Sequence, residues 1–155
     1  MAQAYYGDTT SLPPATVETE ITKLTKWQQT NFGYYLSITT EEVAQMAKEV
    51  YGLSAEIVNI DERAIKEALL DNKLVILPAQ GQLLDNPNFR APGPPYHMLV
   101  ITGWDDHGFI TNDPGTRKGL NYPYNYDTLE AASGSWNHAA QSVDTTDKRV
   151  IIVSN

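Results

Sequence analysis

The stretch from residue 97 to residue 115 restricts the fold more than any other part of the chain. It reads HMLVITGWDDHGFITNDPG, in which two apolar runs flank the polar tetrapeptide at residues 105–108. Apolar runs on either side of a short polar turn are typical of an antiparallel β-hairpin, and Gly108 can supply the positive φ that such turns need. We therefore expect a hairpin whose open ends carry His97 and Asp113.

The register of this hairpin decides whether the two side chains meet. If pairing is centred near Asp106, Leu99 lies opposite Asp113, and His97 lies one step further along the same face. Diagonal neighbours of this kind are about 7–8 Å apart at the backbone, within reach of an imidazole–carboxylate hydrogen bond. A slip by one residue would send the two side chains to opposite faces. The predicted contact therefore requires an odd-length loop or a bulge.

Helical patterns fill the first half of the chain, to about residue 72, and strand patterns fill the second half, from about residue 73. A chain of 155 residues is long enough for one domain with a buried core and too short for two. We therefore expect a single α+β domain over residues 1–155.

Capping and turn residues predict the boundaries of the elements. Thr39 and Glu42 fit a capping box, with Ile38 and Val43 at the flanking apolar positions and Gly52 just past the helix end. Three further helices are predicted in the first half: one ending near residue 6 before Gly7, one capped by Thr16 and ended by Gly33 with Val17, Ile21, Leu24 and Trp27 on one face, and one over residues 61–70. A strand over residues 74–77, stopped by Pro78, is followed by a loop over residues 79–96. Later in the chain we expect a helix over residues 127–132, with Asp127 and Glu130 at capping-box spacing, and a strand over residues 148–153.

Composition and charge argue against several classes of partner. The chain has 11 Lys and Arg against 19 Asp and Glu, a formal net charge of −8, so we expect no nucleic-acid binding and no attraction to anionic membranes. No segment approaches the ~20 apolar residues of a membrane helix. The first residues lack the pattern of a signal peptide, so the sequence as written predicts a cytoplasmic protein.

The chain contains no cysteine, which excludes disulfides, thiolate metal sites and a cysteine nucleophile within these 155 residues.

The predicted pair of His97 and Asp113 has two interpretations. A histidine held by a carboxylate has a defined tautomer and a stabilised imidazolium, which is the base-and-orienter part of a nucleophilic triad. The alternative is a histidine at a strand end, with Asp113 as a capping residue before Pro114. The pattern alone leaves both open.

Other clusters of polar residues carry weaker signals. A metal site could combine His97 and Asp113 with three residues of the turn, Asp105, Asp106 and His107, but a solvated turn has the same composition and the spacing of known metal motifs is missing. Ser133 and Ser135 lie outside any nucleophile motif and are typical of a loop. Alternating Tyr122, Tyr124 and Tyr126 fit either a sugar or peptide platform or an edge strand, which Pro123 favours. His138 is a loop residue without an evident partner.

Three stretches of the sequence, in this order and spacing, resemble a known family. LVILPAQGQLLDNP, PGPPYHMLVITGWDD and FITNDPGTRKGLNYPY resemble the bacteriocin-processing peptidase-like proteins of bacteria, the C39-like branch of the papain-like cysteine peptidases. The helices from Thr16 onward fit the same pattern more loosely, so the resemblance covers most of the chain. It implies a papain-like α+β fold, in which a helical part packs against an antiparallel sheet.

The resemblance also implies a reaction. The catalytic histidine of the family begins the first hairpin strand and matches His97, and the acid that orients it lies in an Asn-Asp-Pro step and matches Asp113. The implied reaction is acyl transfer without a cofactor, typically hydrolysis of a peptide or protein substrate: a thiolate attacks the carbonyl and the histidine protonates the leaving amine. Gln80 and Gln82 are then expected on the substrate side, although a solvated loop explains both residues equally well, and Asn112 is expected as a support beside the acid.

The absence of cysteine departs from the family pattern. The family places its cysteine at the start of a helix near the N-terminus, just after an oxyanion-hole glutamine, and the opening MAQAYYG resembles the last turns of that helix. We therefore expect a domain truncated at its N-terminus, with the cysteine a few residues upstream of Met1. A pseudoenzyme would usually keep the helix and replace the cysteine. Alone, the chain should be inactive and should self-associate through exposed core.

The sequence leaves two other functions open. One is a peptide-binding module in which a cleft formed by His97, Asp113 and the loop over residues 79–96 holds a peptide without cleaving it. The other is a metal-dependent hydrolase. Members of the family are often exported or membrane-tethered through an N-terminal segment, so these residues leave the location of the parent protein open.

Overall fold

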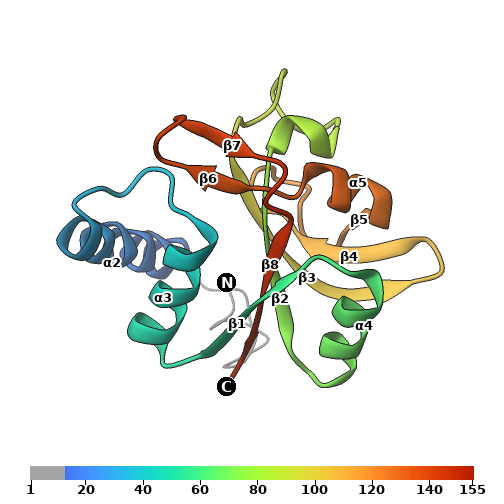
Figure 1. Cartoon of the computed structure of the whole chain (residues 1–155), viewed down its shortest axis with the longest axis horizontal. Coiled ribbons are helices and arrows are strands. Elements are labelled where there is room, and N and C mark those ends of the chain that lie inside the picture. The colour runs from blue at the N-terminus through green and yellow to red at the C-terminus, as the bar shows by residue number, and fades with distance from the viewer. Residues whose placement is uncertain (1–12) are drawn as a thin grey trace.

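The computed structural model describes residues 13–155 (Figure 1). The predicted helix end near residue 6 and the resemblance drawn from MAQAYYG lie outside the described residues. The helices are α2 (Pro14–Phe32), α3 (Thr40–Tyr51), α4 (Glu62–Leu70) and α5 (Tyr126–Ala132), with a short 3-10 helix η1 (Gly81–Leu84). The strands are β1 (Ser54–Asn59), β2 (Leu74–Ala79), β3 (His97–Asp105), β4 (Gly108–Asn112), β5 (Tyr122–Tyr124), β6 (Ser135–Asn137), β7 (Ser142–Asp144) and β8 (Arg149–Ser154).

Six of these strands form one antiparallel sheet in the order β1-β8-β2-β3-β4-β5, and β6 pairs with β7 in a separate hairpin. In Figure 1, α2 and α3 lie to the left of the sheet, and α4 and α5 lie to its right. The fold is therefore α+β, as predicted.

The central strands of the sheet are buried on both faces. Val75, Ile101 and Val150 belong to the core that includes residues of α4 and α5, whereas their chain neighbours Leu74, Val100 and Ile151 belong to the core that includes residues of α3. Because successive side chains of a strand point to opposite faces, strands covered on both sides need continuous apolar runs. By the same alternation His97, at the start of β3, lies on the face of Leu99 and Ile101.

The predicted capping box is confirmed at the start of α3. The Thr39 hydroxyl accepts the backbone N–H of Glu42 at 3.2 Å, and the Glu42 carboxylate accepts the backbone N–H of Thr39 at 2.7 Å. Gly52 ends the helix with a left-handed φ of 67°, which a side chain would disfavour. The box therefore fixes where α3 begins.

The first helix differs from its prediction at the N-terminal end. It begins at Pro14 rather than after a cap at Thr16, because the fixed φ of proline suits the first helical position. Gly33 ends it in the left-handed conformation, as predicted. Val17 and Ile21 are 41% and 57% exposed, so the apolar stripe on this helix is only partly covered by described residues. Self-association through such surface stays a prediction.

Several strand predictions need correction. The first part of the chain is not wholly helical, because β1 lies between α3 and α4 and pairs with the distant β8. Pro78 does not stop β2: pairing with β8 ends at Ile76, so the missing N–H of Pro78 falls where β2 pairs only with β3. The hairpin of β6 and β7 was not predicted.

The cap of α5 also differs from its prediction. Asn125, rather than Asp127, caps this helix by accepting the Thr128 N–H at 2.8 Å.

The predicted hairpin register is confirmed. Val100 pairs with Asn112 and Ile101 with Thr111, after which the register shifts by one residue before Gly103 pairs with Ile110. This bulge supplies the extra residue that the predicted contact required.

Candidate active site

His97 and Asp113 are in direct contact. The imidazole Nε2 lies 2.7 Å from Oδ1 of the carboxylate, and the two side chains are 10% and 0% exposed. His97 is the first residue of β3, and Asp113 directly follows the last residue of β4, so the hairpin register brings the two together. The predicted contact is therefore confirmed, whereas its chemical role stays a prediction.

The Asp113 carboxylate accepts four hydrogen bonds. Oδ1 accepts from His97 and from the backbone N–H of Gly115 at 2.9 Å, and Oδ2 accepts from the Tyr124 hydroxyl at 2.7 Å and from the Asn86 side-chain amide at 3.2 Å. Burial raises the pKa of the carboxyl, but the hydrogen bonds from His97, Tyr124 and Gly115 outweigh burial and hold the pKa below its usual value. Asp113 is therefore ionised at neutral pH.

An ionised Asp113 determines the tautomer of neutral His97. A carboxylate only accepts hydrogen bonds, so Nε2 must carry the proton and donate it. The other nitrogen, Nδ1, is then unprotonated, and no hydrogen bond to it is found among residues 13–155. An imidazole held in this way can take up a proton at Nδ1, as a general base must.

Asn86 and Tyr124 support the other oxygen of the carboxylate, Oδ2. The amide of buried Asn86 donates to the Tyr124 hydroxyl at 2.7 Å as well as to Asp113, and its Oδ1 accepts the Asn88 N–H at 2.9 Å. Burial and the hydrogen bond to Asp113 raise the pKa of Tyr124, so the phenol stays a donor. Sequence reasoning assigned no role to Asn86 and placed Tyr124 only in a tyrosine stripe.

The tyrosine stripe itself fits the edge-strand interpretation. Tyr122 and Tyr124 belong to β5 at the edge of the sheet, and Tyr126 begins α5 instead of continuing the strand.

A glycine lies against the imidazole. A Cβ placed on Gly115 would lie 2.9 Å from Cε1 of His97 and 2.7 Å from Cε1 of Phe89, closer than real Cβ atoms approach. The Phe89 ring packs edge-on against the imidazole, with 5.4 Å between ring centroids. The sequence Asn-Asp-Pro-Gly thus provides both the carboxylate and the space for the ring that it orients.

The three other predicted site residues lie in different environments. Gln82 lines a pocket beside His97, in the loop between β2 and β3. The Gln80 backbone N–H donates to the Ala132 carbonyl at 2.8 Å, and the Asn112 side chain accepts the Asn121 N–H at 3.3 Å. Gln80 and Asn112 thus have backbone partners, and the proposed roles of all three stay predictions.

Comparison with known proteins identifies the family. A family model described as Peptidase_C39 like family matches residues 1–143. The chain belongs to this family. A search of curated proteins found no match.

A solved structure shares the fold of this C39-like domain. It is a crystal structure of a protein from Bacillus anthracis described as a proposed C39-like peptidase, with a TM-score of 0.51 and 15% sequence identity. The match covers 76% of this chain and 59% of that one, so the C39-like domain spans less than two thirds of its structural relative. At this identity the likeness supports the fold alone.

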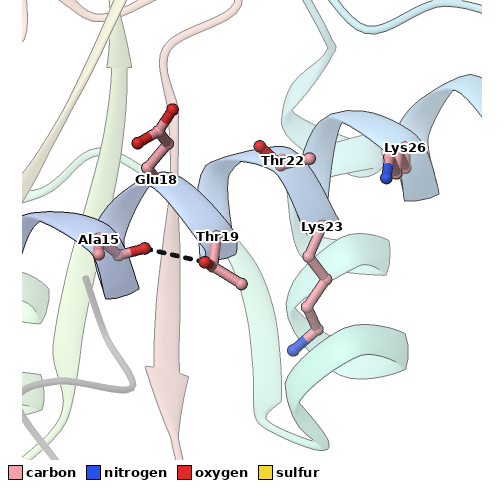
Figure 2. A pocket seen from close by; sticks show the side chains of 6 residues that line it. All are labelled: Ala15, Glu18, Thr19, Thr22, Lys23 and Lys26. Carbon is pink, nitrogen blue, oxygen red and sulfur yellow. Dashed lines mark hydrogen bonds between the residues drawn. The ribbon is translucent and has the colours of Figure 1, made fainter.

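Two of the pockets formed by residues 13–155 differ in character. One, of about 340 Å³, is lined by residues of the loop between β2 and β3, of which Phe89 packs on His97 and Asn86 donates to Asp113. The other, of about 670 Å³, runs along α2 and is lined by Ala15, Glu18, Thr19, Thr22, Lys23 and Lys26 (Figure 2). All six residues come from α2, which carries neither His97 nor Asp113, so the loop pocket is the one that belongs to the candidate site.

A second histidine–carboxylate contact lies elsewhere in the C39-like domain. His138 Nε2 is 3.1 Å from the Glu42 carboxylate and 3.0 Å from the Tyr34 hydroxyl, so the histidine does have partners that the sequence did not reveal. Glu42 also caps α3 through Thr39, and the Tyr34 hydroxyl donates to it. This carboxylate therefore anchors the β6–β7 hairpin to the start of α3, and we assign the cluster a structural role.

The alternatives based on metal and serine gain no support from the C39-like domain. Among residues 13–155, no three His, Asp or Glu side chains are grouped as ligands of one ion would be. Ser135 is buried and accepts the Thr40 N–H at 3.0 Å, which links β6 to α3.

The helices of residues 13–155 lack the combination of length and apolarity needed to cross a membrane.

The pKa of Asp113 predicts a pH dependence of stability. A carboxyl whose pKa is lower in the folded than in the unfolded state stabilises the fold above its unfolded pKa, and this stabilisation is lost as pH falls through the folded pKa. We expect the unfolding free energy of the wild-type chain to fall more steeply below about pH 4 than that of Asp113→Asn, which cannot titrate there. Urea denaturation between about pH 2 and pH 7 measures both slopes. Parallel slopes for the two proteins would contradict the assigned pKa.

Proposed function

We propose that this chain carries the base and the orienting acid of a cysteine peptidase centre, with His97 as base and Asp113 as acid. The observation that carries the proposal is the 2.7 Å contact between Nε2 and a fully buried carboxylate that accepts three further hydrogen bonds. Such a carboxylate holds the imidazole in one tautomer and stabilises the imidazolium that forms when Nδ1 takes a proton. Membership of the C39-like family supports peptide or protein substrates.

The reaction would proceed through a thiolate. Nδ1 of His97 takes the proton of a thiol, and the resulting thiolate attacks the peptide carbonyl to form an acyl-enzyme. The imidazolium returns its proton to the leaving amine. Water, deprotonated by the same Nδ1, then attacks the acyl carbon, releasing the acid and restoring the thiol.

The thiol must come from outside these residues, because the chain contains no cysteine. We propose that a segment N-terminal to residue 1 supplies it, together with a donor for the oxyanion. The 155-residue chain alone would then hold the activating pair without a group to activate.

The test compares two proteins. The 155-residue chain is expected to show no peptide hydrolysis that a thiol-blocking reagent inhibits. A form extended by the in-frame segment encoded upstream is expected to hydrolyse peptides and to lose this activity when blocked. Blocker-sensitive hydrolysis by the short chain, or an upstream segment without cysteine, would contradict the proposal, and the latter result would favour a peptide-binding module.

A further inference from the structure

The pocket in the loop between β2 and β3 shares its wall with the His97–Asp113 pair. It has a volume of about 340 Å³, and its lining includes Gly81, Asn86 and Phe89. A Cβ on Gly81 would lie 3.0 Å from Cβ of His97, the Phe89 ring packs on the imidazole, and Asn86 donates to Asp113. A group bound in this pocket would therefore lie beside the pair.

The lining of this pocket restricts what it can bind. Pro87, Phe89 and Pro92 provide apolar surface, and Gln82 and Asn86 provide amides. Among the lining residues that belong to the described range 13–155, Asp85, which is exposed, is the one ionisable residue. Apolar surface with a single carboxylate suits an apolar or a cationic side chain and disfavours an acidic one.

We propose that this pocket binds one side chain of the peptide on which the His97–Asp113 pair acts, and that it prefers an apolar or cationic side chain to an acidic one. The inference rests on the proposed function, since it assigns the pocket to that substrate. The net charge of −8 also favours the approach of cationic peptides. Asn86 both lines the pocket and holds the carboxylate, so filling the pocket should disturb the environment of Asp113.

The experiment is an NMR titration of the ¹⁵N-labelled 155-residue chain, which requires no activity. The probes are three capped pentapeptides of alanine with lysine, leucine or glutamate at the centre. The lysine and leucine peptides are expected to shift the backbone amides of Gly81 and Gly93 and the side-chain amide of Asn86. The glutamate peptide is expected to bind at least about threefold more weakly than the lysine peptide, a ratio within the range of one exposed charge pair.

Two matched variants test the selectivity. Asp85→Asn is expected to remove the difference between the lysine and glutamate peptides. Asp106→Asn makes the same charge change in the exposed β3–β4 turn and should keep the difference. The inference is overturned if no probe shifts the pocket amides at about 10 mM, or if Asp106→Asn removes the preference as completely as Asp85→Asn does.

The outcomes also separate this inference from the proposed function. Pocket shifts in the short chain without any hydrolysis by the extended form would retain the binding site and reject the peptidase. Blocker-sensitive hydrolysis by the extended form without any pocket shifts would retain the peptidase and reject the subsite.

Discussion

Replacing Gly119 with alanine is expected to destabilise the domain by about 3 kcal/mol and to disturb the His97–Asp113 contact. A Cβ on Gly119 would lie 1.6 Å from the carbonyl oxygen of Asp113 and 2.7 Å from its carbonyl carbon. Both clashing atoms belong to the backbone, so no side-chain rotation relieves the overlap. The Gly119 carbonyl also accepts the Asp113 N–H at 2.8 Å, so the loop can move only by shifting the carboxylate that His97 needs.

Two measurements check this prediction. Urea denaturation gives the loss of stability, and NMR of the imidazole N–H proton reports whether Nε2 of His97 still donates to Asp113. Gly103→Ala is the matched control, because its Cβ would meet only the Ile110 side chain, at 3.7 and 3.8 Å. Equal effects of the two substitutions would show that the close approach at Gly119 does not hold the site.

The His97–Asp113 contact could be predicted because it depends on local sequence. The residues lie 16 positions apart on one hairpin, so the turn and the alternation of apolar residues fix their relative position. The register needed one extra residue, which the bulge between Ile101 and Gly103 supplies. Similarly, the capping box of α3 involves residues three positions apart. Both features follow from short-range geometry.

Elements that depend on distant partners could not be predicted in the same way. Residues 54–59 are short and mix polar with apolar side chains, and they become β1 by pairing with β8 almost a hundred residues later. The sequence predicts a strand end at Pro78, because proline has no N–H to donate. That missing N–H ends a strand only where a neighbouring strand needs the donor, and the position of β8 decides whether one does. Propensity cannot supply such information about neighbours.

The partners of Asp113 show the same limit within the site. Asn86 comes from the β2–β3 loop and Tyr124 from β5, and they meet only once the sheet has formed. A signal for Tyr124 was present in the tyrosine stripe, since a buried phenol needs a hydrogen-bond partner. Asn86 lay within a stretch that resembles the family, but its residue type alone did not indicate a contact with the acid. Predicting one member of a buried network therefore did not reveal the rest.

In an N-terminally extended form that carries a thiol, replacing His97 with alanine is expected to lower kcat/KM for peptide hydrolysis by about 10²–10⁴-fold, the usual contribution of a general base. Asp113→Asn should also lower activity strongly, because an amide oxygen still accepts the Nε2 proton but no longer stabilises the imidazolium. Tyr124→Phe keeps the carboxylate and three of its hydrogen bonds, so its loss should be the smallest of the three. Steady-state kinetics with one peptide substrate gives all three ratios.

The order of these losses distinguishes a catalytic pair from a structural one. If His97 and Asp113 serve only to hold the hairpin, activity should fall in proportion to the fraction of unfolded protein and recover at lower temperature. If they act on the thiol, His97→Ala should stay far less active even in fully folded protein, and its pH profile should lack the base-dependent limb that the wild type shows. The His138→Ala variant is the matched control, since it breaks a second imidazole–carboxylate contact, to Glu42, away from the proposed centre. If His138→Ala loses peptide hydrolysis while His97→Ala retains it, the assignment of His97 as the base is wrong.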